Sequence, residues 1–218
     1  MTIDTADLKR MFDTIAVAIE ADKDRLCQLD GVIGDADHGI AMALGFNAVR
    51  DALASLDLAA TEPTALLNTA AKSFLNAVGA SSGPLYATAF MRGGAAVKGK
   101  ATLADADFTA LFQAMAQGIK DRGKAEPGEK TMVDAWQPAA EAAAAASVAG
   151  KTLAESLGAA LAAAQSGAEA TKDMIAAKGR SSRLGERSLG HIDPGAASAV
   201  TVIGAIRDSV GPIASDRS

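Results

Sequence analysis

Apolar residues recur along this chain at intervals of three and four positions. Leu8, Met11, Ile15 and Ile19 form one such stripe, and residues 108–119 form another. This spacing places apolar side chains on one face of an α-helix. Alternating apolar and polar runs, which are typical of half-buried strands, are nearly absent. The pattern therefore predicts an all-α protein.

The stripes and the residues that break them divide the chain into eight predicted helices. Thr152 and Glu155 have the spacing of a capping box, which marks the start of a helix. Pro84 and Pro194 are each expected at a first helical position. The predicted helices span residues 5–28, 41–56, 64–79, 84–97, 106–122, 132–147, 152–176 and 195–209.

Four of the connections are rich in Gly, Asp, Ser and basic residues. They cover residues 29–39, 79–83, 122–130 and 178–195, after the first, third, fifth and seventh helices. In an up-and-down bundle these connections all lie at one end. The amino termini of four helices lie there too, and their unpaired N–H groups attract anions. We therefore expect one domain over residues 1–218, an up-and-down eight-helix barrel or bundle with its binding site at one end.

The last of these connections is long and polar. Connections above about 12–15 residues without secondary structure are usually functional or disordered. Gly179, Gly185 and Gly190 are typical of a loop that stays mobile until a ligand orders it. We expect residues 178–195 to act as a lid, with a floppy surface loop as the alternative.

Composition narrows the class of protein. Of the 218 residues, 49% are hydrophobic and 22% are charged, as in ordinary globular proteins. The net charge of −5 disfavours a nucleic-acid partner. The amino-terminal residues do not resemble a signal peptide, and charged residues interrupt each apolar stretch that could span a bilayer. Because Cys27 is the single cysteine, no internal disulfide can form. We expect a cytoplasmic protein without a membrane partner.

Three aspartates in the first polar connection are candidate metal ligands. Asp35 and Asp37 are two positions apart, and Asp30 precedes them. Mg²⁺ takes a few carboxylates together with water and phosphate oxygens. An ion between the aspartates and a phosphate would explain an acidic loop at an anion site. The alternative is an acidic turn that caps the second helix, and an Asp-x-Asp pair alone does not exclude it.

Four segments together resemble the ADP-binding L subunit, or L domain, of dihydroxyacetone kinases. They are LDGVIGDADHG (29–39), SSGPLYATAF (81–90), GEKTMVDAWQPA (128–139) and KGRSSRLGERSLGHIDPGA (178–196). The segments occur in the family's order over nearly the whole chain, so the resemblance is specific. That family is an eight-helix barrel with a nucleotide site at one end, in agreement with the expectation from the loops.

The resemblance implies a role for residues in each segment. Asp30, Asp35 and Asp37 would bind two Mg²⁺ ions that bridge the phosphates of ADP or ATP. Arg180 would add positive charge for phosphoryl transfer. The implied nucleotide contacts are His38, Gly39, Ile40, Ala41, Ser81, Ser82, Gly123, Met132, Arg180, Asp193, Pro194 and Gly195.

Three positions depart from the usual family residues. Glycine is usual where Ala36 and Ala87 stand, and glutamine is common where Ile192 stands. Alanine keeps the turn at position 36 small, so we expect the metal site to be retained.

In that family the sugar is bound covalently, through a histidine, on a separate K subunit or domain. The resemblance therefore implies a phosphotransferase subunit that is active only with a sugar-binding K subunit. The phosphate source is either exchangeable ATP or a phosphotransferase-system protein that rephosphorylates bound ADP, and the sequence leaves both open.

Two other classes of function stay open. The first is a non-catalytic module that signals its nucleotide state to a partner. The second is a DxD-type phosphatase with Asp35 as nucleophile and Asp37 as acid. Such a phosphatase needs a parallel sheet with a strand before Asp35, and Val32 and Ile33 are too short a run for one.

Overall fold

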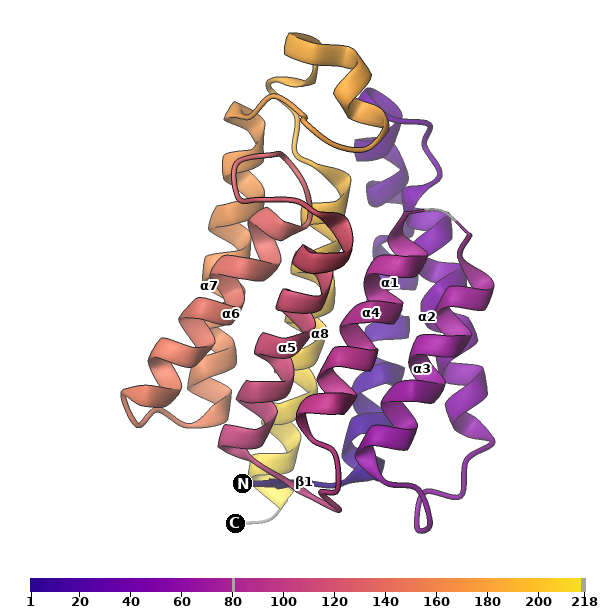
Figure 1. The fold of residues 1–218 in the computed structure, drawn as a ribbon, viewed down its shortest axis with the longest axis vertical. Helices are drawn as coiled ribbons and strands as arrows, with labels where there is room; N and C mark the ends of the chain where they lie inside the picture. The colour runs from indigo at the N-terminus through magenta and orange to yellow at the C-terminus, as the bar shows by residue number, and fades with distance from the viewer. Residues whose placement is uncertain (80, 217–218) are drawn as a thin grey trace.

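A computed structural model of the chain describes residues 1–79 and 81–216. Eight long α-helices run alternately up and down in this part of the chain (Figure 1). They are α1 (Thr5–Ile33), α2 (His38–Ala54), α3 (Pro63–Ala77), α4 (Ser82–Ala96), α5 (Asp105–Gly123), α6 (Val133–Val148), α7 (Leu153–Ala170) and α8 (Pro194–Asp216).

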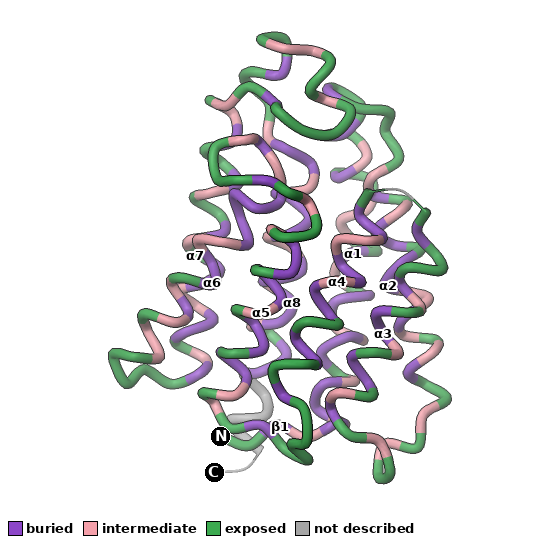
Figure 2. The backbone as a smooth tube through the Cα atoms, viewed as in Figure 1, coloured by how far each residue is buried: buried purple, intermediate pink, exposed green. Residues whose placement is uncertain are grey.

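The helices form a closed ring. Each one packs against the next in the chain, and α8 packs against α1. Buried residues face the inside of the ring and exposed residues face outward, so the core runs along the barrel's interior (Figure 2). This arrangement confirms the predicted all-α, up-and-down barrel. Among the described residues, no helix has both the length and the apolar character needed to cross a bilayer.

Aromatic side chains fill much of the interior. The rings of Phe46 and Phe74 pack edge to face with centroids 5.1 Å apart, and those of Phe12 and Phe90 do so at 5.2 Å. Such pairs stabilise a core by about 0.5–1.5 kcal/mol beyond their burial. Each of these four side chains comes from a different helix, so the cluster ties α1, α2, α3 and α4 together.

Two short strands close the end of the barrel that holds the start of α1. β1 (Thr2–Ile3) pairs antiparallel with β2 (Leu103–Ala104), between α4 and α5. The sequence did not predict this pair, because two residues are too few to show an alternating pattern. In the described residues helix α1 leads directly into Asp35, and the one sheet is this antiparallel pair of short strands, so the fold contradicts the DxD-type phosphatase alternative.

The first polar connection is shorter than predicted. α1 continues to Ile33 rather than ending at residue 28, and α2 begins at His38 rather than residue 41. The prediction was wrong because the Gly and Asp content of residues 29–39 assigned the whole segment to the connection. Instead, Ile33 is buried and extends the apolar stripe of Leu26. Asp30 therefore lies on the last turn of α1, and the connection is only residues 34–37.

The seventh helix ends earlier than predicted. α7 stops at Ala170 rather than residue 176, and a short 3-10 helix, η1 (Thr171–Asp173), follows it. Thr171 is fully buried; its hydroxyl donates to the carbonyl of Ala168 and accepts from the N–H of Asp193. The hydroxyl thereby joins the end of α7 to the start of α8.

Residues 178–195 contain secondary structure, which the sequence did not predict. They contain the 3-10 segment η2 (Arg180–Ser188), which is interrupted at Gly185 with φ 55°. Gly179 and Gly190 also have positive φ, at 66° and 82°. The three glycines thus shape turns that other residues rarely adopt.

Proline positions gave one correct and one incorrect helix start. Pro194 is the first residue of α8, as predicted. Pro84 is the third residue of α4, because that helix begins at Ser82. Proline is tolerated there because first-turn N–H groups have no partner within the helix. The capping box of Thr152 and Glu155 at the start of α7 is confirmed.

Close packing of α6 on α7 gives a prediction for stability. Pro138 has no N–H, so the carbonyl of Asp134 lacks its donor within α6. A Cβ on Gly167 of α7 would lie 1.9 Å from that carbonyl oxygen. We expect Gly167→Ala to lower the free energy of unfolding by about 2–3 kcal/mol, measured by urea denaturation.

Gly158 is the matched control on the same helix. A Cβ there would meet no atom within 4 Å. Gly158→Ala is expected to raise the free energy of unfolding by about 0.5–1 kcal/mol, because alanine loses less backbone entropy in a helix. Equal effects of the two substitutions would contradict the close contact at Gly167.

Candidate functional site

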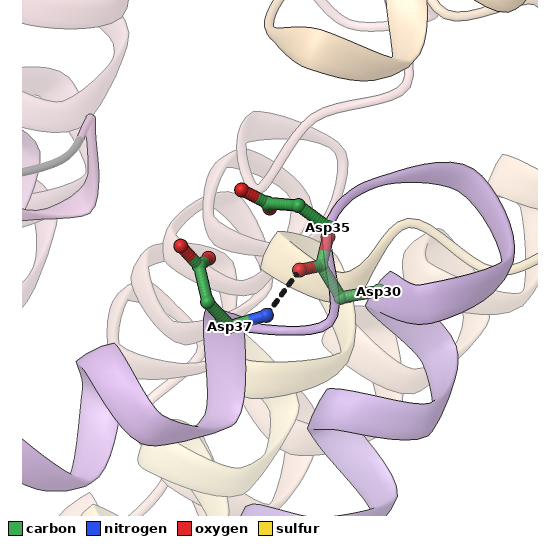
Figure 3. A group of neighbouring side chains, drawn as sticks. All are labelled: Asp30, Asp35 and Asp37. Carbon is green, nitrogen blue, oxygen red and sulfur yellow. Dashed lines mark hydrogen bonds between the residues drawn. The ribbon is translucent and has the colours of Figure 1, made fainter.

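Three carboxylates gather where α1 meets α2. Ligand oxygens of Asp30, Asp35 and Asp37 all lie within 4.8 Å of one another (Figure 3). Asp30 is buried on the last turn of α1, whereas Asp35 and Asp37 are exposed in the connection. Oδ2 of Asp30 accepts the N–H groups of Asp37 at 3.0 Å and His38 at 3.2 Å. The buried carboxylate therefore holds the connection against the helix end.

The turn between the helices is tight. A Cβ at Gly34 would lie 2.1 Å from Oδ1 of Asp30, so only glycine fits there without a shift of that carboxylate. Ala36 has φ 62°, in the left-handed region, which costs a non-glycine residue about 1–2 kcal/mol. A Cβ added at Gly31 would lie 3.3 Å from the Cβ of Ala36. Alanine at position 36 is thus accommodated with some backbone strain.

Arg180 lies directly over the acidic cluster. Its Nη1 contacts Oδ2 of Asp35 and is 3.5 Å from Oδ2 of Asp37. The guanidinium comes from η2, far along the chain from the aspartates. The structure therefore brings the predicted cationic residue and the predicted metal ligands together, and the two exposed carboxylates already face a positive charge.

A cleft of about 440 Å³ opens beside the cluster, within the size range of ligand pockets. All four polar connections contribute to its wall, which confirms that they meet at one end of the barrel. Ala80, in the second of them, lies outside the described residues. The predicted site residues that line the cleft are Asp30, Asp35, His38, Ser81, Ser82, Gly123, Met132, Arg180, Asp193, Pro194 and Gly195.

The predicted metal ligand Asp37 and three predicted nucleotide contacts do not line the cleft. Gly39 faces α1, where a Cβ would lie 2.0 Å from the carbonyl oxygen of Lys23. Ile40 is 51% exposed, and Ala41 packs against the core. Successive residues of a helix point about 100° apart, so a run of neighbours cannot all face one ligand. The side chains of Ile40 and Ala41, and the α-carbon of Gly39, are therefore not part of the cleft wall.

Several lining residues were not among the predicted contacts. Arg122, Lys130 and Lys178 bring positive charge, and Leu85 and Ile119 form part of an apolar wall. Leu85 and Ile119 belong to the apolar faces of α4 and α5 near the helix ends. Their spacing predicts burial but gives no sign that the faces continue into a cleft.

Lys130 joins two of the connections, the one between α5 and α6 and the one between α7 and α8. Its side chain is buried, and its ammonium donates to the carbonyls of Thr171 and His191. Burial lowers the pKa of Lys130, while the nearby carboxylates of Asp193 and Asp134 oppose that shift. The residue has φ 59°, so the backbone bends sharply to turn this side chain inward.

Two further ionisable groups in the cleft have shifted pKa values. Burial raises the pKa of Asp193 to about 7, although its hydrogen bond from the N–H of Ala196 and the charge of Lys130 act against this. Burial also lowers the pKa of His38, which favours the neutral ring, and the nearby Asp30 opposes the shift. Both groups respond mainly to removal from water.

The family model of the DAK2 domain matches residues 32–208. The ADP-binding subunit DhaL of PEP-dependent dihydroxyacetone kinase 1 from Listeria innocua is 36% identical, over 94% of this chain and 97% of that subunit. The corresponding DhaL subunit of Escherichia coli is 40% identical, over 79% and 81%. The subunit of the PTS-dependent kinase of Lactococcus lactis is 34% identical, over 81% and 83%.

Solved structures agree with these matches. The dihydroxyacetone kinase of C. freundii in its native form superposes with a TM-score of 0.74 and 26% identity. The match covers 94% of this chain and 34% of that longer chain. The same kinase in complex with AMP-PNP and Mg²⁺ gives a TM-score of 0.71 and 25% identity, over 92% and 33%. Sequence and fold together show that the chain belongs to the DAK2 domain family.

Proposed function

We propose that this chain is the nucleotide-binding subunit of a PEP-dependent dihydroxyacetone kinase. The observation that carries the proposal is the acidic cluster at the mouth of a positively charged cleft. It occurs in a chain that matches the ADP-binding subunit of Listeria innocua over 97% of that subunit's length.

The donor set of the acidic cluster fits magnesium. Asp30, Asp35 and Asp37 offer hard carboxylate oxygens, and the exposure of Asp35 and Asp37 leaves room for water and phosphate oxygens. We propose that these residues hold two Mg²⁺ ions. When bound, the ions would neutralise the phosphates and stabilise the charge that develops during phosphoryl transfer.

The cleft offers complementary surfaces to a nucleotide. Lys178 and Arg180 place positive charge beside the acidic cluster, on the side where phosphates would lie. Leu85, Ile119 and Met132 provide apolar area for a base. Ser81 and Ser82 stand at the start of α4, where N–H groups without helical partners attract anions.

The proposed reaction needs positioning more than covalent chemistry from this chain. The cleft residues would orient the nucleotide, and Arg180 would face the transferred phosphoryl group. The acceptor is proposed to be a hydroxyl of dihydroxyacetone or another short ketose, bound covalently through a histidine on a separate K subunit. The names of the DhaL relatives support a phosphotransferase-system protein, rather than exchangeable ATP, as the phosphoryl donor.

Retention of ADP tests the proposal directly. Protein loaded with ADP and Mg²⁺ should keep about one nucleotide per chain through gel filtration, and should release it when a chelator removes the metal. Extraction of the protein peak and chromatography of the released nucleotide measure this ratio. Failure to retain or bind ADP in the presence of Mg²⁺ would overturn the proposed function.

A further inference from the structure

A buried serine contacts the histidine that follows the acidic cluster. Nε2 of His38, on the first turn of α2, lies 2.8 Å from Oγ of Ser198 on α8. Ser198 is fully buried, whereas His38 reaches the cleft wall. Since 160 residues of chain separate the two, only the closure of the barrel between α8 and the first helices brings them together. The pair connects the cleft to the barrel's interior.

The surroundings of Ser198 determine which atom carries the proton. Its Oγ is also 3.0 Å from the carbonyl oxygen of Gly195, one turn earlier in α8. A hydroxyl has one proton and a carbonyl can only accept, so Ser198 donates to Gly195. The hydroxyl oxygen is then an acceptor toward His38. Nε2 of His38 must therefore carry the proton in this contact.

Ser198 also has a buried polar neighbour in Tyr86. Tyr86 lies beside Ser198 and Trp136, and burial raises the pKa of its hydroxyl to about 12, which keeps the proton on. The hydroxyl of Tyr86 and the indole N–H of Trp136 are both buried, and neither makes a hydrogen bond of good geometry to another group. Tyr86 thus keeps a proton of its own, and the direction of the His38–Ser198 contact rests on the carbonyl of Gly195.

We infer that Ser198 is a positioning residue that fixes His38 in its Nε2–H form, so that Nδ1 offers a hydrogen-bond acceptor to the nucleotide site. A neutral imidazole carries one N–H, and the nitrogen that lacks it has a lone pair. Phosphate oxygens of bound ADP have no proton to donate. The ligand group that Nδ1 recognises is therefore a donor: a ribose hydroxyl, the amino group of adenine, or a water bound to Mg²⁺. This inference rests on the proposed function.

Nuclear magnetic resonance of the imidazole nitrogens tests the first half of the inference without any ligand. His38 and His191 are the only two histidines, so His191→Gln assigns both sets of signals. The long-range ¹⁵N–¹H spectrum distinguishes the two neutral forms of the ring. We expect His38 in the parent protein to be wholly in the Nε2–H form. Ser198→Ala should show both neutral forms in exchange.

Binding measurements test the second half. We expect Ser198→Ala to weaken Mg-ADP binding about three- to tenfold in titration calorimetry, the effect of one misplaced hydrogen bond. Ser209→Ala is the matched control, because Ser209 is also buried on α8 and its hydroxyl likewise donates one turn back, to Ile206. That control should bind Mg-ADP like the parent. A similar loss with Mg-pyrophosphate would identify a metal-bound water as the donor, and a loss with Mg-ADP alone would identify a donor on the nucleoside.

Distinct results would overturn the inference. An Nδ1–H ring in the parent would show that the serine is a donor, and an unchanged ring form in Ser198→Ala would remove its positioning role. Mg-ADP affinity equal to the parent's, with an altered ring form, would show that His38 is not presented to the ligand. A parent that binds no Mg-ADP would instead overturn the proposed function, and the imidazole spectrum would still decide the state of the His38–Ser198 pair.

Discussion

Replacing Asp35 with alanine is expected to weaken Mg-ADP binding by at least about 100-fold. Groups one step removed from a bound metal change metal affinity by about 10- to 100-fold, so a direct ligand should exceed that range. Asp35 is the member of the acidic cluster whose replacement should disturb the fold least. Its carboxylate is exposed and contacts Arg180, whereas Asp30 is buried and also holds two backbone N–H groups.

Titration calorimetry with ADP at fixed Mg²⁺ measures the change. Asp24→Ala is the control, because Asp24 is an exposed aspartate on α1 and its loss alters the net charge equally. This control should bind Mg-ADP like the parent. If Asp35→Ala also bound Mg-ADP like the parent, the acidic cluster would not be the metal site. The alternative interpretation, an acidic turn that caps α2, would then hold.

Turnover should depend on a second protein. With dihydroxyacetone and a phosphoryl donor, this chain alone should show only background phosphorylation. Addition of a matching sugar-binding subunit should raise the rate by at least about 100-fold, because a correctly placed acceptor hydroxyl is what the chain alone lacks. The measurement is formation of the sugar phosphate, and Asp35→Ala with the same partner serves as the inactive control.

The choice of donor separates the remaining alternatives. Turnover with phosphoenolpyruvate and phosphotransferase-system proteins, but not with added ATP, would support a permanently bound ADP. Turnover with ATP alone would contradict PEP dependence. Rapid turnover by this chain without a partner would contradict the subunit proposal, and binding without turnover under any donor and partner would favour a regulatory module.

Most of the fold was predictable because it depends on local patterns. Apolar stripes gave every long helix, and the placement of the polar connections after alternate helices gave the end at which they meet. Errors arose where tertiary packing overrides local signals. The Gly and Asp content of residues 29–39 predicts a connection, yet burial of Ile33 continues α1 into this segment. Thr171 ends α7 early through contacts with the start of α8, which no local pattern reveals.

Only part of the site could be predicted from the sequence. The aspartates, Ser82 and Arg180 were recognisable because they occur in compact motifs. The inward position of Lys130 could not be predicted, since its two carbonyl partners lie 41 and 61 residues further along the chain. Ser198 gave no signal at all, because a serine inside an apolar helical stripe looks like an ordinary helix residue. Such contacts follow from closure of the ring rather than from any segment.

Ring closure also has a consequence for the order of the chain itself. An even number of alternating helices returns the last one beside the first, so β1 and the far end of α8 both lie at the end away from the cleft (Figure 1). The connection between α6 and α7, around Gly150, lies at that same end. A circular permutant that links α8 to β1 and opens near Gly150 would keep all eight helix contacts and all four cleft-building connections. The fold thus depends on the circular order of the helices around the barrel. The site should form whichever helix comes first along the chain.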